Sequence, residues 1–433
     1  MGGSGKMRGS LHFAHSTRLR LAQGSGRDDT FSLLLCFCSF LERAIYTERS
    51  VSFALLSVQT HRMLLKKKAM ATISPPPAAW AETEGLALDN RAGQRRLRDR
   101  FGRAITDLRL SVTDRCNYRC VYCRTGNEGA QYSELPIEHY LRMVRLMVGL
   151  GIEKVRLTGG EPLLRAGLVE MVRKLAALRT AFDSSGNPTE DGEPLDLALT
   201  TNGHLLESLA APLKEAGLGR VTVSMDAVDP ETFSAITRVP RSYDRVLSGI
   251  RRAAEAGLGP VKVNCVLLRG FNDHQIEAFA DFSRREKVIV RFIEFMPLEE
   301  DRSWRQETVV PMSEILDRLQ AYRPLVELPR HAASETARRF TFDDGLGEIG
   351  IIAPVSRPFC GHCSRIRITS DGKLRTCLFS QSDHDLYGRM LRGGTDHELV
   401  TYIRQVVFQK EERHHIGEPE FEKPSRNMVH IGG

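Results

Sequence analysis

The sequence predicts an α/β fold, a parallel sheet covered by helices, from three observations. Short apolar segments with strand character alternate with longer segments of helical periodicity between residues 106 and 297. The strand–helix unit recurs about six times, at intervals of roughly 30 residues. Polar or glycine-rich motifs follow several of the strands, as they do at the carboxyl ends of strands in α/β barrels. Repeated strand–helix units of this kind form parallel sheets with helices outside.

The elements follow in order from residue 106. The segment TDLRLSV alternates apolar and polar residues and predicts a strand, and the helical pattern that begins at residue 136 stops at Gly151. A polar stretch at 183–194, rich in Gly, Ser and acids, predicts an exposed loop. We expect strands at 106–112, 154–158, 196–200, 220–225, 260–268 and 288–295, and helices at 136–150, 166–182, 205–216, 243–256 and 274–285.

The pattern changes near residue 305. We expect a helix at 313–321, antiparallel strands at 339–342 and 347–353, a hairpin at 365–374, helices at 382–391 and 396–408, and an irregular charged tail. The predicted organisation is therefore a leader (1–98), a barrel domain (99–304) and a C-terminal α+β domain (305–433).

The net charge of +7 is confined to the amino-terminal part. Residues 1–70 hold 11 Lys and Arg against 4 Asp and Glu, so the remaining residues are neutral overall. A neutral body argues against nucleic acid as a partner and favours a local pocket for a small anion. The leader has the composition of a mitochondrial transit peptide, or Met70 is the true start. The apolar run at 31–40 is too short to span a membrane.

Two compact sets of three cysteines predict metal chemistry. Cys116, Cys120 and Cys123 stand in SVTDRCNYRCVYC. Three thiolates hold three irons of a 4Fe–4S cubane and leave the fourth iron open, whereas electron-transfer clusters take four cysteines. A zinc site and unrelated core cysteines are the alternatives. Cys265, in VKVNCVLL, is expected to be a buried strand residue.

The second set is Cys360, Cys363 and Cys377, again with three thiols. An open iron here would bind substrate; the alternatives are an electron-relay cluster and a zinc site of three Cys and one His. His362 lies inside the tight turn and is expected to point away. Arg365 and Arg367 alternate on a strand, so both guanidiniums lie on one face and suit a phosphate or a guanine edge.

The first cysteine motif, with an aromatic residue before its last Cys, resembles the signature of the radical S-adenosylmethionine (SAM) enzymes. The resemblance implies a partial (β/α)6 barrel of the TIM type, for which six repeats rather than eight fit. A doubly wound open sheet is the alternative, but the first turn lacks a dinucleotide-binding fingerprint.

From about residue 97 onward the chain resembles the GTP 3′,8-cyclases of molybdenum cofactor biosynthesis (the molybdenum cofactor biosynthesis protein A family). The resemblance implies a lyase with two 4Fe–4S clusters and SAM, which converts GTP to (8S)-3′,8-cyclo-7,8-dihydroguanosine 5′-triphosphate. In that reaction a 5′-deoxyadenosyl radical takes the 3′ hydrogen of the ribose, and the ribose radical attacks C8 of guanine. The protein contributes mainly positioning.

The resemblance also assigns site residues. It implies Cys116, Cys120, Cys123, Arg365 and Arg367 as catalytic, and both cysteine sets as cluster ligands. Gly159 and Gly160 would let the backbone approach the methionine part of SAM. The SAM contacts would be Tyr122, Gly160, Ser224 and Met296, and the GTP contacts Arg109, Arg156, Thr200, Lys262, Arg365, Ile366 and Arg367. The diglycine Gly432-Gly433 matches the family's tail.

One departure from the family is Arg124-Thr125-Gly126, where Met-Pro commonly follows the third ligand. The resemblance implies a flavodoxin- or ferredoxin-like reductant and transfer of the product to a cyclic pyranopterin monophosphate synthase, and it is compatible with a homodimer. We expect the bacterial cytoplasm as location, or the mitochondrial matrix if the leader is a transit peptide. The other functional classes are a peptide-modifying radical SAM enzyme with an auxiliary cluster and a non-enzymatic iron–sulfur electron carrier.

Overall fold

The computed structural model of the chain describes residues 96–123, 129–183, 185–299 and 303–432. The chain divides into two compact units, Met1–Leu86 and Ala87–Gly433, and all described residues belong to the second unit. Most of the predicted leader and the Arg124–Gly126 departure therefore lie outside the described residues. Within the predicted leader, Leu97 is described and belongs to the folded unit, because it is buried and its N–H donates to the Leu150 carbonyl at 2.8 Å.

The described strands form one mixed sheet. Its order is β12-β11-β10-β1-β2-β3-β4-β5-β6-β9-β8-β7, and the eight central strands from β10 to β9 run parallel. The strands are β1 (Asp107–Ser111), β2 (Lys154–Thr158), β3 (Asp196–Thr201), β4 (Arg220–Ser224), β5 (Lys262–Leu267), β6 (Ile289–Glu294), β7 (Leu325–Leu328), β8 (Arg338–Phe342), β9 (Glu348–Ile352), β10 (Arg365–Ile368), β11 (Lys373–Arg375) and β12 (His384–Asp385). The sheet curves but does not close, which confirms the predicted partial barrel.

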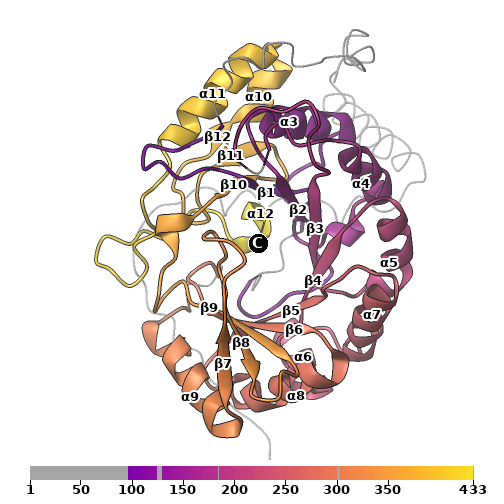
Figure 1. Cartoon of the computed structure of the whole chain (residues 1–433), viewed down its shortest axis with the longest axis vertical. Coiled ribbons are helices and arrows are strands. Elements are labelled where there is room, and N and C mark those ends of the chain that lie inside the picture. The colour runs from indigo at the N-terminus through magenta and orange to yellow at the C-terminus, as the bar shows by residue number, and fades with distance from the viewer. Residues whose placement is uncertain (1–95, 124–128, 184, 300–302, 433) are drawn as a thin grey trace, which may run out of the picture. The chain divides into compact units, whose positions relative to one another are not determined.

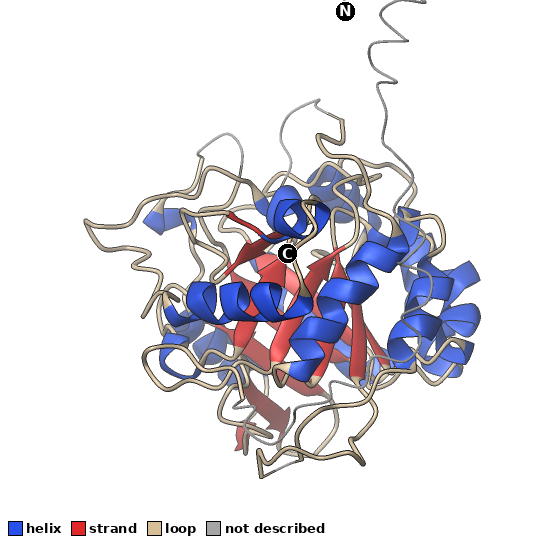
Figure 2. Ribbon diagram, turned by 90° about the horizontal axis from the view of Figure 1, so that it is seen from above, coloured by secondary structure: helices blue, strands red, loops and turns tan. Residues whose placement is uncertain are grey.

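Helices cover the convex face of this sheet (Figures 1 and 2). The C-terminal end of the described chain lies on the opposite side, within the arc of strands in Figure 1. The helices are α3 (Ile137–Gly149), α4 (Leu168–Ala176), α5 (Leu206–Glu215), α6 (Pro230–Thr237), α7 (Tyr243–Glu255), α8 (Ile276–Glu286), α9 (Met312–Tyr322), α10 (Leu386–Leu391), α11 (Asp396–Phe408) and α12 (Met428–Ile431), with 3-10 turns η2 (Pro162–Leu164), η3 (Asp273–Gln275), η4 (Gln306–Thr308) and η5 (Cys360–His362).

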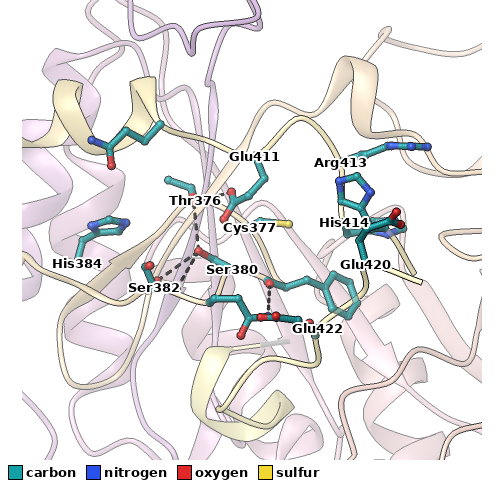
Figure 3. A pocket seen from close by; sticks show the side chains of 14 residues that line it. Thr376, Cys377, Ser380, Ser382, His384, Glu411, Arg413, His414, Glu420 and Glu422 are labelled. Carbon is teal, nitrogen blue, oxygen red and sulfur yellow. Dashed lines mark hydrogen bonds between the residues drawn. The ribbon is translucent and has the colours of Figure 1, made fainter. Parts of the chain in front are cut away.

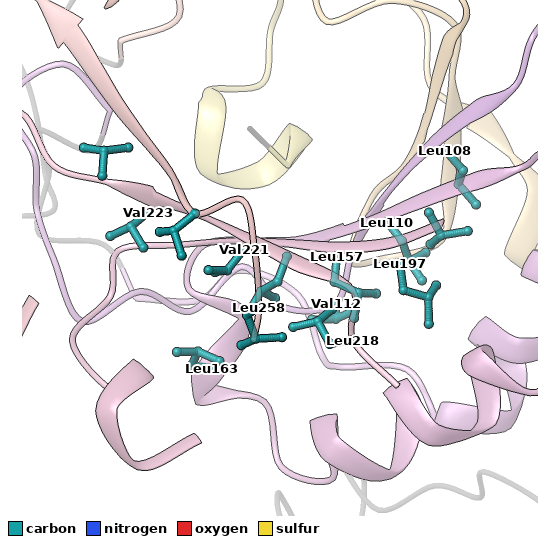
Figure 4. Packing of buried hydrophobic residues seen from close by; sticks show 14 of the residues in the cluster. Leu108, Leu110, Val112, Leu157, Leu163, Leu197, Leu218, Val221, Val223 and Leu258 are labelled. Atoms are coloured by element: carbon teal, nitrogen blue, oxygen red, sulfur yellow. The ribbon is translucent and has the colours of Figure 1, made fainter. Parts of the chain in front are cut away.

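Alternation along the strands separates the core from the cavity. In β1 the side chains of Leu108 and Leu110 are buried in the hydrophobic core, whereas Arg109 between them points to the other face. Figure 4 shows these leucines packed with apolar residues of the neighbouring strands. Each fully buried leucine side chain contributes about 1.5–3 kcal/mol. The outer face therefore stabilises the sheet and leaves the concave face free for polar residues.

Most predicted elements are confirmed within one or two residues, with two clear errors. The helix predicted for 382–391 begins only at Leu386, because His384 and Asp385 pair with β11 as strand β12. The helix predicted for 166–182 ends at Ala176. The following residues pair instead with the polar insertion, through bridges from Arg179 to Pro194 and from Phe182 to Pro188. The insertion is thus partly a hairpin rather than a free loop. The sequence analysis also missed α6, which Asp229 caps by accepting from the N–H of Thr232 at 2.8 Å, and the short helix α12.

Residues after 305 add to both edges of the same sheet. Strand β9 extends it beside β6, and β10 extends it beside β1, so segments far apart in the sequence become neighbours. The predicted antiparallel pairs β8–β9 and β10–β11 are confirmed. The division at residue 304 stays a prediction. In the described part of the chain, no helix combines the length and the apolar character needed to cross a membrane.

Candidate active site

One large cavity opens on the concave face of the sheet. It is lined by all six predicted cysteines and by the predicted residues Arg109, Tyr122, Arg156, Gly160, Thr200, Ser224, Met296, Arg365 and Arg367. These residues come from the carboxyl ends of parallel strands, from the loops after them and from the C-terminal region. The structure therefore brings together residues that are more than 250 positions apart in the sequence.

Two predicted residues are not in the cavity wall. Ile366 is fully buried in the hydrophobic core on the opposite face of β10, so that its backbone is the part left to face a ligand. Lys262 shares a face of β5 with Asn264 and Val266, which do line the cavity, but lies nearer the amino end of the strand.

The first cysteine loop rests on α6. The backbone N–H groups of Arg119 and Val121 donate to the carbonyls of Thr237 and Ile236 at 3.1 and 3.0 Å. The N–H of Cys123 donates to the Cys120 carbonyl at 3.0 Å, which closes a tight turn. The helix that the sequence analysis missed thus fixes the loop that carries the first three thiols.

Gly159 and Gly160 pack against the chain that enters this loop. A Cβ atom on Gly159 would lie 2.4 Å from the Thr113 carbonyl oxygen, and one on Gly160 would lie 2.3 Å from the Arg115 carbonyl oxygen. The N–H of Gly160 donates to the Thr113 carbonyl at 2.8 Å. The two glycines are therefore required by backbone packing, a reason the sequence analysis did not foresee.

Glu161 follows these glycines and ties β2 to β3. Its carboxylate is buried and accepts from Asn202 N, Thr201 Oγ1 and Leu163 N at 2.6, 2.7 and 2.9 Å. Burial raises the pKa of Glu161 to about 7 although the three donors favour its charged form. Its place in the Gly-Gly-Glu-Pro motif was the available sequence signal.

The first set of thiols lies beside a buried acid. Tyr122 donates a hydrogen bond from its hydroxyl to Asp226 Oδ2 at 2.8 Å. Burial raises the pKa of Asp226 to about 6. Burial, Asp226 and the two neighbouring thiols also hold the pKa of Cys120 well above its usual value.

The second set of thiols lies beside cations. Burial raises the pKa of Cys363, but Arg365 and Lys410 outweigh it and bring the value to about 7. Arg365 donates to the Cys363 sulfur at 3.6 Å and stacks over the Phe359 ring at 4.9 Å. His362 is exposed and does not line the cavity, as predicted. Burial, by contrast, raises the pKa of Cys360 and Cys377, and Glu411 adds to this at Cys377, so the cations outweigh burial at Cys363 alone.

The three thiols of each set face the cavity together, which is what an open 4Fe–4S cubane requires, since each thiolate binds a different iron. A site for a single metal ion, such as zinc, instead requires several ligands that converge on one point. Among the described ranges, no three His, Cys, Asp or Glu side chains converge in this way.

Buried cations line the floor of the cavity. Strand register places Arg109 between Arg367 and Arg156. Burial, followed by repulsion from neighbouring arginines, lowers the pKa of Arg109 and Arg156 to about 9 and that of Arg367 well below its usual value. The same causes lower the pKa of Lys262, which stands outside the cavity wall on β5, to about 8. Crowded cations of this kind need an anionic partner.

Arg291 belongs to this group and was missed. It stands on β6 and lines the cavity; burial, followed by repulsion from Arg220, lowers its pKa to about 10. Its position in VIVRFIEF, alternating with buried apolar residues, gave the same signal that identified Arg109.

The C-terminal tail enters the cavity. Met428 and Val429 line it, and Arg367 donates from Nη1 to the Gly432 carbonyl oxygen. Outside the cavity the tail is anchored by a bidentate ion pair of Arg426 with Asp371, at 2.9 Å for both contacts. Gly433 lies outside the described residues.

Comparison with known proteins assigns the class. The family model for the Radical SAM superfamily matches residues 110–283. Two solved structures of Streptococcus suis SuiB share the fold at low identity: the complex with the precursor peptide SuiA (TM-score 0.52, 13% identity, 75% of this chain and 76% of that chain) and the complex with S-adenosylmethionine (TM-score 0.50, 14% identity, 92% and 87%). The chain is a member of the radical SAM superfamily. This membership implies a 4Fe–4S cluster and SAM.

Closer relatives define the family. The model for Molybdenum Cofactor Synthesis C matches residues 288–416. GTP 3′,8-cyclases from Acidothermus cellulolyticus, Rhodopirellula baltica and Streptomyces coelicolor are 43%, 41% and 40% identical, over 70%, 77% and 79% of this chain and 82%, 91% and 98% of theirs. The chain belongs to the GTP 3′,8-cyclase family of molybdenum cofactor biosynthesis, which confirms the family predicted from the cysteine motifs.

Proposed function

We propose that the cavity binds SAM and GTP side by side and that the chain catalyses the 3′,8-cyclisation of GTP. The observation that carries this proposal is the meeting, in one cavity, of two sets of three thiols and a floor of buried cations. The cations supply what a triphosphate needs, and the thiols supply two places for a cluster with an open iron.

Cys116, Cys120 and Cys123 would hold the first cluster at one end of the cavity. With SAM bound, this cluster supplies the radical that removes a hydrogen atom from substrate. Tyr122 and Gly160 lie at the cysteine loop, Ser224 ends β4 and Met296 follows β6, so these four residues surround the space for SAM. Asp226 holds the Tyr122 hydroxyl in place.

Arg109, Arg156, Lys262 and Arg367, together with Arg291, would bind the triphosphate. Arg156 is oriented by Thr200 and Thr222, whose hydroxyl oxygens accept from its Nη1 at 3.2 and 3.1 Å. Thr200 would then both contact the ligand and orient Arg156. Binding an anion here would relieve the repulsion among the guanidiniums. This relief would itself contribute to the affinity for the triphosphate.

Cys360, Cys363 and Cys377 would hold a second 4Fe–4S cluster, which would supply an iron for binding the purine. Arg365 and the backbone at Ile366 lie beside these thiols and would fix the base so that C3′ and C8 of GTP approach each other. We also propose a flavodoxin- or ferredoxin-like reductant, delivery of the product to a cyclic pyranopterin monophosphate synthase and a location in the bacterial cytoplasm.

Anaerobic reconstitution with iron, sulfide, SAM, reductant and GTP tests the proposal. Release of 5′-deoxyadenosine is expected with GTP and not with ATP; release that ignores the nucleotide would refute it. Cys363→Ser should keep SAM binding and lose tight GTP binding. Cys265→Ala is the matched control, because Cys265 is buried in β5 and belongs to neither set.

A further inference from the structure

Cys377, one of the second set of thiols, lies between the main cavity and an outer hollow. Figure 3 shows this hollow, with Cys377, Glu411 and His414 among the side chains in its wall. Cys377, Phe379 and His414 line both spaces. Any group bound by the second set of thiols would therefore lie against the His414 ring.

His414 is held in one orientation. Its backbone hydrogen-bonds to the Cys360 thiol, and its ring packs against Phe379 at 5.3 Å between centroids. Its Nδ1 accepts from the Ile416 N–H at 3.2 Å. Because Nδ1 is the acceptor, the ring proton is on Nε2.

The Nε2–H group of His414 lacks a visible acceptor. Nε2 is buried and has no hydrogen-bond partner among the residues that the structure describes. A buried donor in a native protein is normally paired, so its acceptor is expected in whatever fills the adjoining space. His414 lines the main cavity together with Cys360, Cys363 and Cys377, so that cavity supplies the space for the acceptor.

We propose that Nε2–H of His414 donates a hydrogen bond to a sulfur atom of the second cluster and thereby raises its reduction potential. The inference rests on the proposed second cluster. Hydrogen bonds to the sulfurs and nearby charge are established determinants of cluster potential. His414 acts here with Arg365 and Lys410, whereas the first set of thiols faces Asp226. Glu411 acts on Cys377 against these two cations, so the hydrogen bond from His414 adds to Arg365 and Lys410 in the presence of that carboxylate.

The test uses the full chain with Cys116→Ser, Cys120→Ser and Cys123→Ser, so that the second cluster alone can assemble. The potential is measured by a redox titration followed by electron paramagnetic resonance. His414→Phe should shift it to a more negative value, with reduction about tenfold less favourable, which is about 59 mV for one electron. His414→Gln, which keeps an N–H donor, should return it toward the parent value.

His415→Asn is the control. His415 lines the outer hollow but not the main cavity, and its ring pairs with Glu418 at 2.8 Å. Its φ of 58° is one that asparagine tolerates. The reduction potential of the second cluster in the His415→Asn variant should equal that in the parent. Should His414→Phe fail to hold iron, His414→Met compared with His414→Gln makes the same comparison.

The outcomes distinguish failure of the proposed second cluster from failure of the hydrogen bond proposed for His414. If the triple serine parent binds no iron, the second cluster is wrong and this inference falls with it. If it binds about four irons and His414→Phe leaves the potential unchanged, the inference alone is overturned. A weaker GTP affinity at unchanged potential would also overturn it, because the acceptor would then be the nucleotide.

Discussion

Arg291 donates a hydrogen bond from Nε to the Oδ1 atom of Asn264 at 3.0 Å. Its other acceptor is the Thr222 hydroxyl, at 3.3 Å from Nη2. Both acceptors are uncharged, so these contacts orient the guanidinium without neutralising it. Arg220, two strands away on β4 and outside the cavity wall, pairs instead with Asp196. The difference marks Arg291 as available to an anionic ligand.

Arg291→Met should raise the Kd for GTP by about 10- to 100-fold, since a hydrogen bond to a charged group is worth about 1.5–3 kcal/mol. It should also raise the free energy of unfolding of the ligand-free protein, because repulsion among buried cations falls. Isothermal titration calorimetry and urea unfolding measure the two effects.

Arg220→Met is the matched control and should change the Kd little, because Arg220 does not line the cavity. Equal losses of affinity in the two variants would contradict the distinction between paired and unpaired arginines.

The sequence predicted the fold well wherever a pattern was local. Alternation in TDLRLSV placed Arg109 on the cavity face, and the same argument applied to Arg365 and Arg367. It would have found Arg291, had the strand been considered for its polar residue as well as its apolar ones.

Long-range pairing was beyond such reasoning. The neighbours Arg109 and Arg367 are set by the register between β1 and β10, and that register depends on packing rather than on either segment alone. The end of α4 was predicted wrongly for the same reason. Thr180 exchanges hydrogen bonds with Glu193, and Gly192 lies against its carbonyl, so a tertiary contact overrides local helix propensity.

Lys262 predicts a pH dependence of GTP binding. Burial, followed by repulsion from Arg291, lowers its pKa to about 8. Above that pH the free protein has lost the ammonium proton, and a triphosphate must restore it on binding. Affinity should therefore fall as pH rises from 7 to 9, and binding should take up a proton there.

Calorimetry in two buffers with different ionisation enthalpies measures this uptake. In Lys262→Met the Kd should be higher at pH 7 and the slope between pH 7 and 9 shallower; comparing variants cancels the titration of the nucleotide itself. Lys214→Met, at an exposed lysine, should keep the parent's slope. An unchanged slope in Lys262→Met would place the titration elsewhere.

Gly160→Ala should prevent the first cluster from assembling. The added Cβ would meet the Arg115 carbonyl oxygen at 2.3 Å, and backbone cannot move aside as a side chain can. We expect iron to fall from about eight to about four per chain. Gly361→Ala, between two ligands of the second set, meets nothing within 4 Å and should keep the full iron content. Full iron in Gly160→Ala would show that the cysteine loop does not depend on this packing.

Gly432 and Gly417 separate backbone strain from crowding in the tail. Both have a φ of +83°, so alanine costs each about 1–2 kcal/mol. A Cβ on Gly417 meets open space, whereas one on Gly432 would lie 2.9 Å from Ser111 Cβ and 3.1 Å from Thr158 Cγ2. Gly432→Ala should therefore displace its carbonyl from Arg367 and lower the cyclisation rate about tenfold, the effect of about 1.4 kcal/mol. Gly417→Ala should lose similar stability in urea unfolding and keep the rate. Because the two positions share the same φ, equal rates in the two variants would mean that the contact between Arg367 and Gly432 does not contribute to turnover. A loss confined to Gly432→Ala would assign the effect to the place of the tail in the cavity.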